Sequence, residues 1–328
     1  MKTIGSAAVA SAFPNVLLGA QAERTSVAVF WEPGFPAIKD CGVTKEALQQ
    51  SLSSFAVTFL NERELIEQLS VTRFDLLVTP YGSAFPKRAW NEILKYLRAG
   101  GNWLNVGGVP LSRPVMRAGV QWRAEPHQTT YHKLLGITHS FPVKGDASSS
   151  YEGPAELKNG LKATEIYELY IRLSSSNNEP DEAGSDGPHE GVVEAWLKGI
   201  NSDGRRVAAP VIQIDRLRAE FAGGRWILAN FTGTLDPDAL RLLAEIASQG
   251  ASRFEVETSF ACYRQDETPS FSVGLMRPKG DLFKRTPGDY SIEVRNEAGA
   301  LVHSFKLPFA DNANATSLDF PDTPKLPP

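Results

Sequence analysis

Residues 75–79, Asp-Leu-Leu-Val-Thr, run directly into Pro80-Tyr81-Gly82, and this stretch decides the fold. A short apolar run that ends at a turn signal is typical of a strand buried on both faces. Lys87–Ala99 follows with apolar residues on one helical face, and Gly100-Gly101 ends that helix. Asn102–Val106 is again a buried strand. A strand, a helix and a second strand in this order predict a parallel crossover.

The same alternation precedes this stretch. Ser26–Phe30 and Ala56–Leu60 read as buried strands, while Lys45–Ser54 and Glu62–Ser70 read as helices. Thr44 fits the N-cap of the first helix because its hydroxyl can accept from free backbone N–H groups. Alternating strands and helices place helices on both faces of a parallel sheet. We therefore expect an α/β domain with a doubly wound, mostly parallel sheet.

This domain is predicted to span residues 24–250, with an irregular insertion at 109–191 in which no period is sustained. Residues 174–191 are polar, acidic and glycine-rich, which indicates an exposed loop. Further strands are expected, with Gly223-Gly224 as a hairpin turn before the last of them, at Val192–Ile200, Ala208–Asp215, Leu217–Phe221 and Trp226–Phe231. Leu235–Ser248 is predicted as the closing helix.

After Gly250 the pattern becomes all-β. Apolar and polar residues alternate, with turn signals between the runs, in Arg253–Tyr263, Ser270–Met276, Asp289–Arg295 and Leu301–Leu307. The spacing predicts a partial immunoglobulin-like β-sandwich over residues 251–328.

The two ends of the chain suggest export and a longer protein. Residues 1–22 read as a signal peptide with Ala20-Gln21-Ala22 as the cleavage site; a short N-terminal helix is the alternative. The segment after Met1 resembles the part of a twin-arginine signal that follows the Arg-Arg pair, and that pair is missing here. The end, Phe320–Pro328, reads as a link to further domains or as a proline-rich tail. We expect a periplasmic or extracellular protein.

Composition narrows the function classes. The 328 residues are 42% hydrophobic and 22% charged, with a net charge of −4, which indicates a globular chain without a basic stripe for nucleic acid. No apolar run is long enough for a membrane span. Cys41 and Cys262 form neither a disulfide framework nor a thiolate metal site. A single bridge between them is an alternative if the protein is exported.

The first group of candidate binding residues lies at the carboxyl ends of the predicted parallel strands. Ligands in open α/β sheets bind at this edge. The side chains placed there are Trp31, Glu32, Tyr81 and Ser83, beside Gly82, Gly107 and Gly108. Neither glycine-containing turn matches a phosphate-binding fingerprint, and we expect no cofactor.

A second group lies in the loop 123–141, where His127, His132 and His139 cluster. With Glu125 they are candidates for zinc, but the spacing matches no helical ligand pair, so an ordered aromatic loop is favoured over a metal site. Trp122 and Tyr131 are candidates to stack on sugar rings or to pack in the core.

Several stretches together resemble the class I glutamine amidotransferase-like fold. The resemblance covers about 130 residues and is carried by Asp75–Thr79, by Trp90-x-x-Ile93-x-x-Tyr96-Leu97-x-x-Gly100-Gly101, by Arg206–Pro210 and by Gly223–Leu228. More narrowly, the chain is similar to degenerate versions of this fold in large secreted glycoside hydrolases, such as the trimerisation domain of family 42 β-galactosidases.

The resemblance implies a loss of catalysis. Active amidotransferases place a nucleophilic cysteine in a G-x-C-x-G elbow with His and Glu partners, whereas this chain has Pro80-Tyr81-Gly82-Ser83-Ala84 there. A nucleophile needs a base within hydrogen-bond reach, and no motif supplies one. We therefore predict no catalytic residue within this chain.

The sequence thus favours a non-catalytic N-terminal scaffold or oligomerisation region of a larger exported carbohydrate-active enzyme. Its expected partners are carbohydrate, further copies of itself and downstream domains of the same chain. One alternative is a hydrolase or amidase with a site near Glu32, Tyr81, Ser83 and His132. The other is a sugar-binding module that uses Trp31, Trp122 and Tyr131.

Overall fold

The computed structural model describes residues 24–143, 150–173 and 190–251 in full, and the backbone of four later strands. The described residues fall into two compact units, one that ends at Ala251 and one made of the later strands. The predicted signal peptide, residues 1–22, lies outside the described residues. In the part that the structure describes, no helix is both long and apolar enough to cross a membrane.

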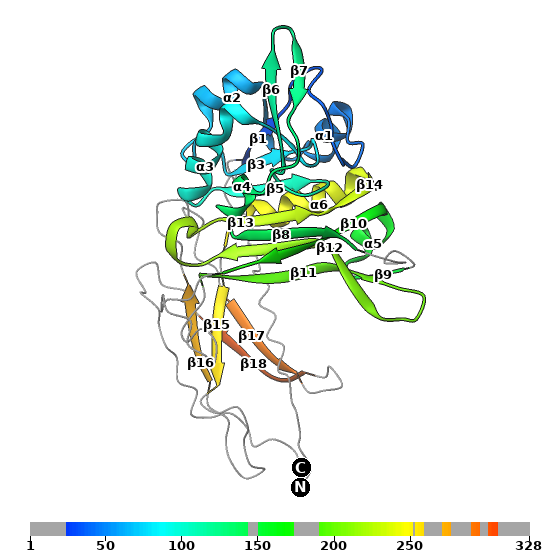
Figure 1. The fold of residues 1–328 in the computed structure, drawn as a ribbon. Helices are drawn as coiled ribbons and strands as arrows, with labels where there is room; N and C mark the ends of the chain where they lie inside the picture. Colours follow the sequence, from blue (N-terminus) through cyan, green and yellow to red (C-terminus); the bar gives the residue numbers. More distant parts are fainter. Residues whose placement is uncertain are drawn as a thin grey trace, which may run out of the picture. The chain divides into compact units, whose positions relative to one another are not determined.

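The first unit is built on a mixed eight-stranded sheet in the order β2-β1-β3-β5-β13-β12-β11-β9 (Figure 1). The parallel strands are β2 (Ala56–Leu60), β1 (Ser26–Phe30), β3 (Leu76–Thr79), β5 (Asn102–Val106) and β13 (Arg225–Ala229). The antiparallel strands that extend it are β12 (Arg206–Arg216), β11 (Gly191–Ile200) and β9 (Ser150–Glu152). The predicted bounds of β1, β2 and β5 are confirmed.

Helices cover both faces of this sheet. One face carries α2 (Glu62–Gln68), the 3-10 turn η1 (Lys87–Ala89) and α3 (Trp90–Arg98), and the other carries α1 (Lys45–Ser51) and α6 (Pro237–Ser248). Successive residues of β1 alternate between the two cores: Ala28 and Phe30 enter the first, Val27 and Val29 the second. This double burial explains the uninterrupted apolar runs of the strands.

Side-chain caps set where the helices begin. Thr44 Oγ1 accepts from the Ala47 N–H at 3.2 Å, which confirms the predicted N-cap of α1. Asn61 and Glu64 form a capping box at the start of α2. Asp236 is the N-cap of α6, where its Oδ1 accepts the Ala239 N–H at 2.8 Å.

Residues 109–191, in which the sequence shows no sustained period, hold several regular elements. In order these are β6 (Arg113–Ala118), β7 (Gln121–Ala124), α4 (Thr130–Lys133), β8 (Ile137–Pro142), β9, α5 (Ala155–Gly160) and β10 (Leu161–Ile171). The hairpin β6–β7 pairs with β4 (Ala84–Pro86) and projects from the domain (Figure 1). A second small sheet has the order β14-β10-β8, where β14 is Phe231–Leu235.

One predicted strand is wrong. Leu217–Phe221 forms no strand; Ala219–Phe221 is the 3-10 turn η2, and Ala219 has a φ of +62°. These residues belong to the connection between β12 and β13, which Arg216 closes through its N–H to the Gly224 carbonyl at 2.9 Å. The side chain of Phe221 packs at this turn, with its ring centroid 5.1 Å from that of Trp226. This packing accounts for an apolar residue outside a strand.

The second unit contains two antiparallel pairs. β15 (Arg253–Thr258) pairs with β16 (Phe271–Met276), and β17 (Tyr290–Arg295) pairs with β18 (Leu301–Leu307). Strands are therefore present at the four predicted places, and residues 259–263 of the first predicted strand lie outside the described residues. Their assembly into a sandwich stays a prediction, and Cys262 lies outside the described residues.

Candidate functional site

The carboxyl ends of β1 and β3 bring Trp31, Glu32 and Tyr81 together. This is the place where the strand order reverses, and open α/β sheets bind ligands at such points. The Tyr81 hydroxyl accepts the Glu32 N–H at 2.9 Å and donates to the Glu32 carbonyl at 3.0 Å. Burial raises the pKa of Tyr81 to about 12, so the side chain is a neutral phenol at pH 7. Its hydroxyl therefore holds the backbone of the first turn.

The Glu32 carboxylate joins two elements that the sequence did not connect. Its Oε1 lies 3.1 Å from Nη2 of Arg117 on the hairpin β6–β7, and its Oε2 accepts the Glu62 N–H at 3.1 Å. Glu62 is the first residue of α2, so this contact satisfies one of the free N–H groups of the helix. The carboxylate is thereby engaged on both oxygens.

Glu62 itself is a buried acid beside Glu32. Its Oε1 has no hydrogen-bond partner among the described residues, and its Oε2 lies 4.0 Å from Nη1 of Arg88. Burial raises the pKa of Glu62, and the nearby Glu32 carboxylate acts in the same direction. Arg88 and Arg117 oppose the shift. The site therefore holds two carboxyl groups and two guanidinium groups.

Aromatic rings surround this charged group. The Tyr81 ring centroid lies 5.5 Å from that of Trp31 and 4.9 Å from that of Phe35. Phe35 in turn contacts Trp122, whose ring lies 4.8 Å from the Arg117 guanidinium. Trp31 and Trp122 are half-buried. The structure thus places Trp122 with the strand-end residues, and not only with the histidine loop as the sequence indicated.

Ser83 points into the protein. It is only 3% exposed, and its Oγ accepts the Val109 N–H at 2.8 Å. The Ser83 N–H donates to the Ile38 carbonyl at 2.7 Å. Among the described residues no hydrogen bond connects Ser83 with a histidine or a carboxylate. The hydroxyl thus stabilises the turn after β5 by accepting this N–H.

A loop at residues 38–40 covers the strand ends above Ser83. Lys39 has a φ of +56°, which a side-chain-bearing residue seldom adopts. A Cβ built on Gly82 would lie 2.4 Å from the Ile38 carbonyl oxygen, and one on Gly108 would lie 2.3 Å from Ser83 Oγ. Glycine at these turns is therefore required by the close approach of the loop.

Polar contacts tie this loop to the second half of the domain. Lys39 Nζ lies 2.8 Å from Glu165 Oε2 on β10, and the Tyr167 hydroxyl donates to the same carboxylate. The Lys39 ammonium lowers the pKa of Glu165, while burial raises that of Tyr167 to about 12. The loop 38–40 is therefore held by main-chain hydrogen bonds to the turn after β3 and by the ion pair of Lys39 with β10.

The two neighbouring histidines of the second candidate group lie beside each other, and one of them is fully buried. His132 has its Nδ1 3.3 Å from the Pro110 carbonyl, whereas its Nε2 has no partner among the described residues. Burial lowers the pKa of His132 to about 4, so the ring is neutral at pH 7. The His127 ring lies 6.2 Å away. Tyr131 packs edge-on against Phe85 and Trp90.

Metal-binding and thiol chemistry have little support in the described ranges. There, no group of three or more His, Cys, Asp or Glu side chains is placed to hold a metal ion. Cys41 is a free, buried thiol whose Sγ lies 3.5 Å from the Phe231 carbonyl oxygen. Burial raises the pKa of the Cys41 thiol, which disfavours the reactive thiolate.

Comparisons with known proteins give no family. No family model matches the chain, and no curated protein matches it. Among solved structures the chain is similar to Gan42B, a GH42 β-galactosidase from G. stearothermophilus, with 12% identity and a TM-score of 0.36 over 90% of this chain and 40% of that chain.

Two further solved structures are similar. The β-galactosidase from Rahnella sp. R3 has 11% identity and a TM-score of 0.34 over 91% of this chain and 41% of that one. A ThuA-like protein from Bacteroides uniformis has 13% identity and a TM-score of 0.30 over 70% of this chain and 92% of that one. The chain therefore spans about two fifths of the length of these β-galactosidases.

Proposed function

We propose that this chain is a non-catalytic scaffold region of a larger exported carbohydrate-active enzyme. The observation that carries the non-catalytic part is the environment of Ser83, the serine of the turn that the resemblance matches to the nucleophile elbow. Its hydroxyl is buried and accepts the Val109 N–H. A serine becomes a nucleophile when an adjacent base takes its proton, and Ser83 has no such neighbour among its described hydrogen-bond partners.

The other strand-end groups support the same proposal. Both carboxylate oxygens of Glu32 and the hydroxyl of Tyr81 are committed to contacts within the domain. General acid–base catalysis needs a group that can reach a substrate proton. These groups instead hold α2, the hairpin β6–β7 and the turn after β1 together. Such contacts are expected of residues with a structural role.

The finer parts of the proposal rest on separate observations. The order β2-β1-β3-β5-β13 supports an amidotransferase-like, doubly wound core, and the pairs β15–β16 and β17–β18 support the start of an immunoglobulin-like module. The link to carbohydrate and to oligomers rests on the sequence resemblance described above. Export rests on Ala20-Gln21-Ala22.

Two measurements test this function. The full chain should hydrolyse neither p-nitrophenyl β-galactoside, p-nitrophenyl acetate nor glutamine faster than buffer does, and Ser83→Ala should behave alike. Turnover that disappears in Ser83→Ala, while circular dichroism shows the variant folded, would contradict the proposal. Sequencing the gene beyond both ends should reveal a catalytic barrel domain, and its absence from the reading frame would refute the larger-enzyme part.

A further inference from the structure

The small sheet β14-β10-β8 carries a group of exposed rings. Tyr170 on β10 is the register partner of His139 on β8, and Glu168 is the partner of Phe141. Residues two apart on a strand share a face, and so do direct partners across an antiparallel pair, so these four side chains lie on one face of the sheet. Phe141 is 53% exposed and Tyr170 is 49% exposed. We name His139, Phe141 and Tyr170 the aromatic platform.

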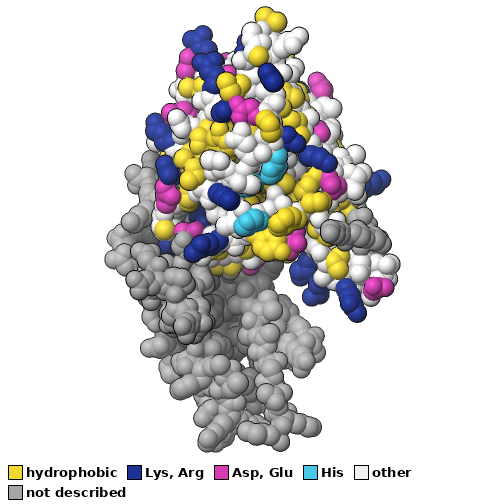
Figure 2. All heavy atoms as spheres, in the orientation of Figure 1, with side chains coloured by type: hydrophobic (Ala, Val, Ile, Leu, Met, Phe, Trp, Pro, Cys, Tyr) yellow, Lys and Arg dark blue, Asp and Glu magenta, His cyan; other side chains and the backbone are white. Residues whose placement is uncertain are grey.

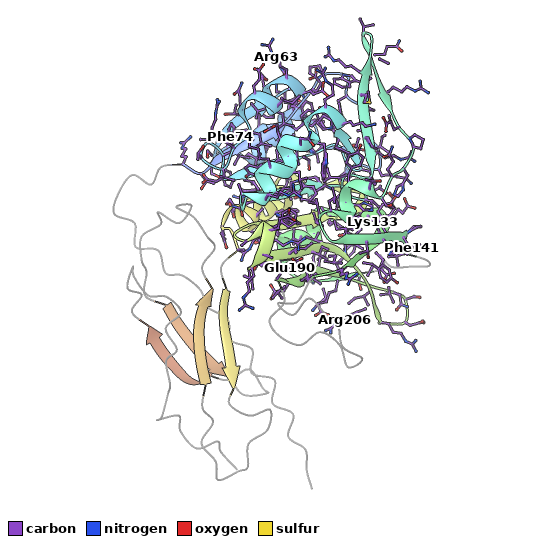
Figure 3. The ribbon with its side chains drawn as sticks, turned by 60° about the vertical axis from the view of Figure 1, so that its left-hand side comes forward. Arg63, Phe74, Lys133, Phe141, Glu190 and Arg206 are labelled. Carbon is purple, nitrogen blue, oxygen red and sulfur yellow. The ribbon has the colours of Figure 1, made fainter. Side chains whose placement is uncertain are left out.

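The rings of the platform are arranged in contact with one another. The planes of His139 and Phe141 lie within 5° of parallel, with centroids 6.3 Å apart. Tyr170 stands nearly perpendicular to both, 5.9 Å from Phe141 and 6.4 Å from His139. Figure 2 shows hydrophobic side chains beside a histidine on the face that carries β8, and Figure 3 places Phe141 at the outer margin of the domain.

Three polar side chains stand at the rim of the platform. The Tyr170 hydroxyl, the His139 ring nitrogens and the Glu168 carboxylate make no hydrogen bond with another described residue. A phenol and an imidazole can each donate and accept, while a carboxylate accepts strongly. Within the described residues, the surface therefore combines an apolar floor with three polar groups that have no hydrogen-bond partner, whereas the polar groups of Tyr81 and Glu32 are satisfied inside the domain.

We propose that the aromatic platform binds a pyranose ring of a carbohydrate. A pyranose has an apolar C–H face that can lie on an aromatic ring and a rim of hydroxyl groups that can bond to Glu168, His139 and Tyr170. The size of the surface favours such a ligand over a second copy of the chain. Half-exposed rings offer about 100 Å² each, so the platform offers about 300 Å², whereas a stable protein interface takes about 800 Å² per partner.

This proposal is independent of the scaffold role, because a scaffold needs no ligand. The test uses the full chain and two probes, methyl β-D-galactopyranoside and cellobiose, in saturation-transfer NMR titrations. A platform of this size should bind at least one of them with a Kd on the order of 1 mM. Phe141→Ala should weaken binding at least tenfold, and Tyr170→Phe, which removes only the hydroxyl, should weaken it several-fold.

Val193→Ala is the matched control, because Val193 is an exposed apolar residue on another strand, β11. It should bind like the wild type, and circular dichroism should be unchanged in all variants. Saturation transfer from neither sugar at concentrations up to about 20 mM would overturn the proposal. So would equal binding by Phe141→Ala. A dimer in ultracentrifugation that dissociates in Phe141→Ala would assign the platform to self-association and overturn it as well.

Discussion

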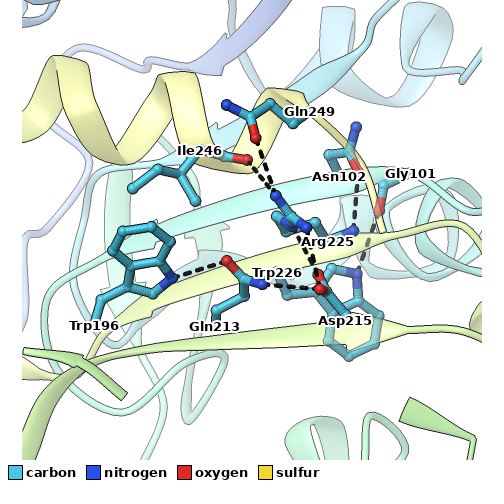
Figure 4. Close-up of polar contacts among 9 residues, drawn as sticks. All are labelled: Gly101, Asn102, Trp196, Gln213, Asp215, Arg225, Trp226, Ile246 and Gln249. Carbon is cyan, nitrogen blue, oxygen red and sulfur yellow. Dashed lines mark hydrogen bonds and ion pairs between the residues drawn. The ribbon is translucent and has the colours of Figure 1, made fainter. Parts of the chain in front are cut away.

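Arg225 donates two hydrogen bonds to Asp215, its register partner across β12 and β13. The Arg225 Nε lies 2.7 Å from Oδ1, and Nη2 lies 3.1 Å from Oδ2, with both side chains nearly buried (Figure 4). Gln213 donates to the same carboxylate at 2.8 Å. The third nitrogen of the guanidinium reaches the carbonyl of Ile246 and the side chain of Gln249 at the end of α6. The pair thus joins α6 to the place where the sheet becomes antiparallel.

Asp215→Asn should lower the free energy of unfolding by about 3–5 kcal/mol, because it leaves the Arg225 charge buried without its counter-ion. Urea denaturation measures this change. Glu152→Gln is the matched control, since Arg206 donates two similar bonds to Glu152 at 2.8 and 2.9 Å on an exposed surface. It should cost at most about 1 kcal/mol. Equal costs for the two variants would show that burial adds nothing to the inner pair.

His132 should make the protein sensitive to mild acid. Its pKa is lowered to about 4 in the folded state from 6.5, so the unfolded state takes up the proton first as the pH falls. The stability from this group is complete above pH 6.5 and is lost between pH 6.5 and about 4, by up to about 3 kcal/mol. His132→Leu should flatten this part of the stability–pH curve. A wild-type slope in His132→Leu would contradict the assignment.

Gly108→Ala should be among the most damaging single-methyl changes in the domain. The residue has a φ of +58°, and the new Cβ would lie 2.3 Å from Ser83 Oγ and 2.7 Å from the Lys39 carbonyl oxygen. We expect a loss of about 3 kcal/mol or more. Gly119→Ala is the control for backbone strain without a steric clash, because Gly119 has a φ of +67° and a Cβ added there would have no heavy atom within 4 Å. It should cost about 1 kcal/mol. Similar melting temperatures for both variants would argue against a tightly packed loop.

Glu62→Gln should stabilise the protein at pH 7. The buried carboxyl has a raised pKa and one oxygen without a described partner, so a neutral side chain of the same shape should gain about 1 kcal/mol. The folded state binds this proton before the unfolded state does, so the advantage of the variant should shrink as the pH falls through the folded pKa. Glu67→Gln on the exposed side of α2 is the control, with a change near zero. A destabilised Glu62→Gln would mean that the attraction to Arg88 outweighs burial.

The parallel half of the sheet was predictable because its signals are local. β1, β2 and β5 are apolar runs between turn residues, and Thr44 caps its helix by accepting an N–H only three residues away. The strand Leu217–Phe221 was predicted wrongly because its local apolar pattern has another cause. Phe221 is buried by contacts with Arg216 and Trp226 across a turn, and an apolar residue in a packed turn resembles one in a strand.

The charged part of the site could not be predicted, because its contacts join distant residues. Arg117 lies 85 positions from Glu32, and Glu165 lies 126 positions from Lys39. No period or motif relates such pairs, and only the folded sheet brings them together. Strand-end reasoning did predict that Trp31, Glu32 and Tyr81 lie together, since the carboxyl ends of adjacent parallel strands must meet at one edge.

The main-chain bonds of the loop at 38–40 limit what protein engineering can change at the strand ends. The loop is fixed by main-chain bonds, Ile38 N–H to Tyr81 and Ser83 N–H to Ile38, so no exchange of side chains would remove it. The side chain at position 83 faces the Val109 amide and is only 3% exposed. A redesign that opens these strand ends to solvent would therefore have to change the length of the loop itself.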